Sequence, residues 1–189
     1  MAILIAGLVL FLGGHTLTTL RGPRAALIAR LGEGPYKGLY SLVATAGLAL
    51  IVWGFARYRD EGYLQIWNPP AALRPVTFVL MWLAFVALAA AYAPAGRIKA
   101  TLRHPMLVAV KAWALAHLLV NGDLGALVLF GAVLVWAGYD RIAVKRRGDP
   151  GAAPVKGVTA GDAIALVVGT IAFAGMFWLH PRVLGIAIA

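Results

Sequence analysis

The chain contains no cysteine among its 189 residues. Disulfide bonds, thiolate metal ligands and covalent attachment of haem through thioether bonds are therefore excluded. Charge is scarce as well, because 13% of the residues are charged and Asp and Glu together number seven. An ordinary soluble domain carries about 25% charged residues, so this composition points away from that class.

Apolar residues take the place of the missing charge. They make up 62% of the chain, and the mean hydropathy is +0.86. These values predict an integral membrane protein whose main partner is the lipid bilayer. The net charge of +10 does not predict nucleic-acid binding, because the basic residues lie in short loops between apolar runs and not on one domain face.

Six apolar segments are each close to the 20 or so residues that a helix needs to cross a bilayer. They are rich in Ala, Leu, Val and Gly and lack the alternation of a transmembrane β-strand. We therefore expect an all-α polytopic bundle of about six transmembrane helices, forming a single domain over residues 1–189. The predicted helices lie near residues 2–20, 38–56, 75–93, 105–121, 124–140 and 161–180.

The basic residues are distributed unequally between the two sets of loops. Twelve lie in the loops that follow the first, third and fifth predicted helices, and four lie on the opposite side. The positive-inside rule therefore predicts a multi-pass protein of a bacterial inner membrane, with both termini in the periplasm. Residues 24–34 are expected to form a short interfacial helix, and residues 146–159 are expected to form a flexible basic loop.

Residues 101–124 place polar side chains inside an apolar run. His104 and Lys111 are seven residues apart and share a helix face, whereas His117 lies about 120° round the helix from Lys111. Lys111 could extend to lipid phosphates at the inner surface, or could face a cavity and bind a carboxylate or another anionic group. A possible second polar site is predicted from the following residues: Arg103, His104, Lys111, Asn121 and Asp123.

Two histidines stand within apolar helices. His15 and His117, each taken alone, are expected to be neutral and hydrogen-bonded to a neighbouring carbonyl group. Two intramembrane histidines on different helices also suit the axial ligation of haem iron, because neutral imidazole is a good ligand and a helix bundle can enclose the flat macrocycle.

Several short motifs resemble the NnrU family of integral membrane proteins. Besides His15 they are GPYKGLYSLV (34–43), GRIK (96–99), RHPM (103–106), AHLL (116–119), NGDL (121–124) and DR (140–141). The resemblance runs from the first predicted helix to about residue 145. It implies one of two functions: a link to denitrification and nitric oxide metabolism, as in bacterial members, or isomerisation of a carotenoid-like apolar small molecule, as in the related 15-cis-zeta-carotene isomerases.

The resemblance also implies a cofactor, haem b, with His15 and His117 as axial ligands of the iron. The isomerases carry a cysteine at the position of Ala114, so a thiol cannot replace histidine as a ligand in this chain. On the predicted topology, His15 lies about 9 Å from the inner boundary at Arg21 and His117 about 21 Å from Arg103. A tilted first helix, or one that continues past Arg21, would close part of this gap. Without either, His15 is better matched in depth to His104.

Two other functions are compatible with the sequence. The chain could be a non-enzymatic membrane factor for assembly or regulation of nitrite or nitric oxide reduction. Alternatively, the Arg103-His104-Pro105 segment resembles the start of the cofactor region in membrane methyltransferases and sterol reductases. The acidic, Tyr-rich segment that follows in those enzymes is replaced here by residues 144–150, which do not have that pattern. The sequence leaves the catalytic residues, the substrate and the oligomeric state open.

Overall fold

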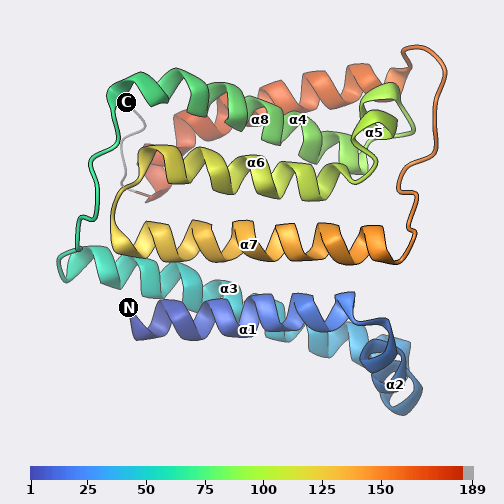
Figure 1. Ribbon diagram of the computed structural model, residues 1–189, viewed down its shortest axis with the longest axis horizontal. Coiled ribbons are helices and arrows are strands. Elements are labelled where there is room, and N and C mark those ends of the chain that lie inside the picture. The colour runs from blue at the N-terminus through green and yellow to red at the C-terminus, as the bar shows by residue number, and fades with distance from the viewer. Residues whose placement is uncertain (185–189) are drawn as a thin grey trace. The chain divides into compact units, whose positions relative to one another are not determined.

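The computed structural model describes residues 1–184, which form eight α-helices, a 3-10 turn and connecting loops (Figure 1). The elements are α1 (Ala2–Thr19), α2 (Arg21–Leu31), α3 (Glu33–Asp60), η1 (Ala71–Leu73), α4 (Arg74–Tyr92), α5 (Arg97–Leu102), α6 (Pro105–Val120), α7 (Leu124–Arg146) and α8 (Ala160–Leu184). Five of them are long and apolar enough to cross a membrane, and α6 is a shorter apolar helix. The predicted all-α polytopic bundle is confirmed.

The outer surfaces of the long helices are apolar. Large hydrophobic side chains are strongly exposed on four of them: Val9 is 68% exposed, Leu42 67%, Val135 73% and Ile171 66%. Exposing such surfaces to water is unfavourable, whereas contact with the hydrocarbon of a bilayer is not. The apolar outer sides of these helices therefore face lipid, and the chain is an integral membrane protein.

The described chain divides into two compact units, which are treated separately. The first unit contains Met1–Asn68 and Gly122–Ala143, and so comprises α1, α2, α3 and most of α7. Here α1 packs along α3, with Gly7 against Ile51 and Gly54 against Leu4, so the two helices are antiparallel (Figure 1). Contacts at both ends of α7 make it parallel to α1.

Glycine sets the distance between α1 and α3. A Cβ atom at Gly7 would lie 2.6 Å from the backbone nitrogen of Ile51, and one at Gly54 would lie 2.4 Å from that of Leu4. Gly47 makes the same kind of contact with Phe11. Small residues at such points allow helix backbones to approach closely, which is how helices commonly associate in lipid.

The second unit contains Pro69–Asn121 and Val144–Ala189, of which residues 185–189 are outside the described part. In this unit α4 packs against both α6 and α8. The Thr77 hydroxyl lies 3.4 Å from the Ala116 carbonyl oxygen, and Trp82 Nε1 donates to Thr170 Oγ1 at 3.0 Å. Within each unit, helix directions agree with those that alternating membrane crossings require.

A short helix that the sequence analysis did not predict, α5, connects α4 to α6. Asp162 at the start of α8 fixes it by accepting hydrogen bonds from the backbone N–H groups of Arg97 (3.0 Å) and Ile98 (2.7 Å). Lys99 Nζ donates to the carbonyl oxygens of Ala91 and Ala93 and so caps the end of α4. Six residues are too few for hydrophobic periodicity to reveal a helix, so these caps explain why it forms.

The two predicted non-spanning segments are also visible. Helix α2 begins and ends three residues earlier than the expected 24–34 segment. Residues 147–159 contain turns but no helix. Gly148, at φ +66°, ends α7. Its N–H donates to the Lys145 carbonyl oxygen, and the Asp149 N–H donates to the Val144 carbonyl oxygen. These bonds form a Schellman cap. The expected periplasmic C-terminus lies outside the described residues, and the single domain over 1–189 stays a prediction.

Candidate functional site

His15 lies in the first unit within a group of aromatic rings. Its ring centroid is 4.2 Å from that of Phe11, and 5.5 Å from each of Tyr40 on α3 and Trp136 on α7. Its Nδ1 is 2.7 Å from the Phe11 carbonyl oxygen. The half-buried imidazole is therefore placed where all three spanning helices of this unit meet.

Polar groups on α1 and α7 continue the site one turn further. The Thr19 hydroxyl donates to Asp140 Oδ1 at 2.9 Å and lies 3.2 Å from the His15 carbonyl oxygen. The indole Nε1 of Trp136 is buried and has no hydrogen-bond partner among the described residues. Burying such a donor costs about 1 to 3 kcal/mol, so an unsatisfied N–H beside His15 marks this region as one that suits a ligand.

The sequence analysis did not single out Trp136, and it missed this grouping. The signal was present, because His15 and Thr19 on α1 have the same four-residue spacing as Trp136 and Asp140 on α7. Two parallel helices with equal spacings can align both pairs. Hydropathy alone does not reveal which helices are neighbours.

His117 lies in the second unit, near the end of α6, in a local setting that closely matches that of His15. Its Nδ1 is 2.8 Å from the Trp113 carbonyl oxygen, and the two rings are 5.0 Å apart. Asn121 Nδ2 donates to the His117 carbonyl oxygen at 2.8 Å. Each histidine thus follows an aromatic residue by four positions and precedes a hydrogen-bond donor by four.

This arrangement determines which ring nitrogen carries the proton. A carbonyl oxygen only accepts hydrogen bonds, so Nδ1 of His15 and of His117 must be the protonated nitrogen in a neutral ring. Nε2 then carries the lone pair, and this is the tautomer in which histidine ligates a metal through Nε2. The prediction that each ring is hydrogen-bonded to a neighbouring carbonyl group is confirmed.

Asp123, predicted for the second polar site, has a structural position in the first unit. Its Oδ1 accepts from the Ala126 N–H at 2.9 Å and caps α7, and its Oδ2 is 3.2 Å from Arg59 Nη1. Asp123 is only 3% exposed, and the Arg59 guanidinium lies 4.9 Å from the centroid of Tyr63. This ion pair holds the last turn of α3 against the start of α7.

Arg103 and His104 form a tight turn in the second unit. Arg103 has φ +60° and ψ −50°, and the His104 N–H donates to the Leu102 carbonyl oxygen at 2.6 Å. This is a γ-turn, rare and strained for a residue with a side chain. The Arg103 carbonyl oxygen accepts from the Ala152 N–H at 2.8 Å, so the loop after α7 holds this turn.

The predicted second polar site is not one compact cluster. His104 precedes α6, Lys111 lies within it, and Asn121 follows its last residue. Because 17 residues separate His104 from Asn121, the two ends are about 25 Å apart along the helix. Only His104 and Lys111, two turns apart, remain candidates for a shared site with Arg103.

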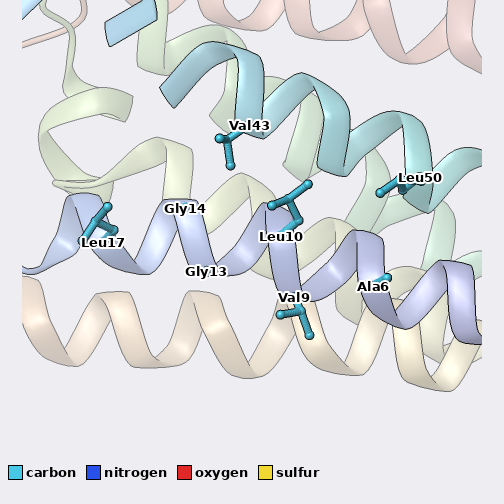
Figure 2. A pocket seen from close by; sticks show the side chains of 8 residues that line it. All are labelled: Ala6, Val9, Leu10, Gly13, Gly14, Leu17, Val43 and Leu50. Carbon is cyan, nitrogen blue, oxygen red and sulfur yellow. The ribbon is translucent and has the colours of Figure 1, made fainter. Parts of the chain in front are cut away.

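An open apolar groove of about 760 Å³ runs along α1 in the first unit (Figure 2). Its lining residues are Ala6, Val9, Leu10, Gly13, Gly14 and Leu17 of α1 with Val43 and Leu50 of α3. At 100° per residue, Ala6, Gly13 and Leu17 lie about 180° to 200° round α1 from His15. The groove is therefore on the opposite side of the helix from the histidine.

The described residues contain no group of three or more His, Asp or Glu side chains that could hold a metal ion.

A family model with the description "NnrU protein" matches residues 3–188 of the chain. The chain belongs to the NnrU family. The match extends well past residue 145, where the motifs noted in the sequence end, and covers the five long apolar helices and the shorter α6. No curated protein and no solved structure matches this NnrU-family protein.

Proposed function

We propose that this NnrU-family membrane protein binds haem b, and that His15 and His117 would hold its iron. The observation that carries the proposal is the matched setting of the two rings, each of which donates from Nδ1 to the carbonyl oxygen four residues earlier. That bond fixes the ring orientation and leaves the Nε2 lone pair for a metal. Neutral imidazole of this tautomer fits haem iron.

The surrounding side chains suit the same group. Phe11, Tyr40 and Trp136 provide aromatic surface beside His15, and Trp113 provides it beside His117. The buried Trp136 N–H could donate to an acceptor oxygen of a bound group. When bound, haem would supply redox or Lewis-acid chemistry, while this chain's residues hold the histidine rings and exclude water.

The biological role that we propose is a link to denitrification and nitric oxide metabolism, or to isomerisation of an apolar, carotenoid-like molecule, in the inner membrane with a periplasmic N-terminus. Both roles come from what the resemblance of the sequence motifs implies. A non-enzymatic assembly or regulatory factor for nitrite and nitric oxide reduction is the alternative, and it would function without either histidine.

Absorption spectroscopy of the purified protein tests haem binding. The protein, expressed with ample haem supply, should show a Soret band and yield haem b in a pyridine haemochrome assay. His15→Ala and His117→Ala should each lose or shift that band, whereas Lys156→Ala, the control in the exposed loop after α7, should leave it unchanged.

The ratio of haem to protein decides whether the two histidines share one group. Helix α1 ends at Thr19 and α2 begins at Arg21, so α1 does not continue past the basic boundary to bring His15 deeper. One haem per chain that both variants lose supports shared ligation, and independent partial losses support separate groups. A colourless, iron-free preparation would contradict the proposal.

A further inference from the structure

One end of the second unit concentrates positive charge. Two hydrogen-bonded contacts bring its segments together: Asp162 of α8 holds the start of α5, and Ala152 in the loop after α7 holds Arg103. The side chains that this end exposes include Arg97, Arg103, Lys145, Arg146 and Lys156. We call this group the basic end of the unit.

The two carboxylates of the second unit do not neutralise the basic end. They are Asp149 and Asp162, because the other five acidic residues belong to the first unit. Asp162 is 3% exposed and accepts from Arg97 N, Ile98 N and Thr159 N, all backbone groups. Asp149 accepts from the Gly151 N–H at 3.0 Å. Within this unit, the positive charge of the basic end is therefore not balanced.

Lys111 extends this charge into the apolar helix. It lies six residues after Pro105, about 9 Å along α6, and it is half-buried. Its ammonium group makes no hydrogen bond or ion pair with the residues that the structure describes. A cation at that depth is costly in hydrocarbon unless an anion meets it.

We infer that Lys111, with His104 and Arg103 at the start of the same helix, binds the phosphate of an anionic phospholipid headgroup. The four-carbon stem of lysine carries its ammonium back toward the membrane surface, where lipid phosphates lie. His104 is half-buried two turns before Lys111 on nearly the same face, and Arg103 is exposed beside it. A lipid is the favoured source because its phosphate is held at the hydrocarbon boundary, within reach of a residue inside the helix.

Lipid retention by the full-length protein tests this inference. The protein is reconstituted with an equal mixture of phosphatidylglycerol and phosphatidylcholine, washed in detergent, and its bound lipids are measured by mass spectrometry. The wild type should retain phosphatidylglycerol preferentially. Lys111→Met should reduce that preference about fivefold, the effect of one lysine near a charged membrane.

Two further variants separate a site from general attraction. Lys156→Met removes the same charge from the exposed loop and should change the preference by less than about twofold, because surface charge is screened. Lys111→Arg keeps the charge and should retain the lipid, which also covers the case in which Lys111→Met fails to fold. Equal losses in Lys111→Met and Lys156→Met, or no loss in either, would overturn the inference.

Inorganic phosphate provides the other arm of the experiment. One outcome is that free phosphate binds to the detergent-solubilised protein in a Lys111-dependent manner but leaves the retention of phosphatidylglycerol unchanged. The site then serves a soluble anion, and the lipid assignment is wrong. Absence of such binding, together with Lys111-dependent lipid retention, supports the headgroup site. Haem content is unaffected by any of these outcomes, so this inference and the proposed function stand or fall separately.

Discussion

His15 and His117 each have an aromatic residue four positions before and a hydrogen-bond donor four positions after. The preceding carbonyl orients the ring, and the following side chain, Thr19 or Asn121, binds the carbonyl oxygen of the histidine itself. In a helix these positions stack on one face. Each ring is thereby oriented by its own helix, before any contact with a neighbouring helix is made.

Thr19 also connects α1 to α7, and its loss should destabilise the first unit. Thr19→Val keeps the shape but leaves the Asp140 carboxylate without the hydroxyl that donates to it at 2.9 Å. An unsatisfied buried acceptor costs about 1 to 3 kcal/mol, and the half-buried Asp140 should fall at the low end, near about 1 kcal/mol. Each kcal/mol lowers Tm by about 2 to 4 °C in a chain of this size. Thermal unfolding in detergent measures the change.

Thr16→Val is the matched control for that substitution. The Thr16 hydroxyl donates to the Leu12 carbonyl oxygen at 2.7 Å, within α1 itself. Its removal should therefore lower Tm by much less than removal of the Thr19 hydroxyl. Equal decreases in the two variants would show that the contact between Thr19 and Asp140 contributes no stability.

The sequence indicates some of these side chains and not others. His15, His117, Lys111 and His104 stand out because polar residues are rare in apolar helices. Asp162 and Trp136 do not stand out, since a carboxylate near a helix start and a tryptophan in a spanning helix are both common. Their roles depend on α5 and on His15, which are distant in sequence and brought near only by folding.

The packing of α1 against α3 should be disrupted by a methyl group added at one glycine of α3 and should tolerate a methyl group at another. Gly54→Ala places a Cβ 2.4 Å from the Leu4 backbone nitrogen, so the helices must separate, at a cost of about 1 to 3 kcal/mol. Gly38→Ala, on the same helix, meets nothing within 4 Å and should gain up to about 1 kcal/mol from helix propensity. The Tm changes in detergent should have opposite signs.

The extents of the six apolar helices follow from the sequence, whereas their grouping does not. Apolar runs of about 20 residues, ended by Gly, Pro and charged residues, identify each span within a few positions. Helices that are apolar on all sides carry no stripe that points to a partner. The association of α7 with α1 and α3 depends on small contacts such as that of Thr19 with Asp140.

The orientation of the whole molecule can be measured because the chain has no cysteine. Single cysteines introduced as Glu61→Cys and Lys156→Cys lie at exposed positions in loops that the positive-inside rule assigns to opposite sides. In bacterial cells, a membrane-impermeant maleimide should label the first directly and the second only after permeabilisation. The reverse pattern would place the basic loops outside.

The first unit is discontinuous along the chain, since α1 and α3 are joined by α7 only after α4, α5 and α6 have been synthesised. A ribosome adds residues in order, so the α1 and α3 pair enters the membrane without its third helix. The polar groups that meet α7, Thr19 and Arg59, must be tolerated there in the meantime. Assembly of the His15 site is therefore a late event of biogenesis, and truncation before residue 122 yields a chain in which that site is absent.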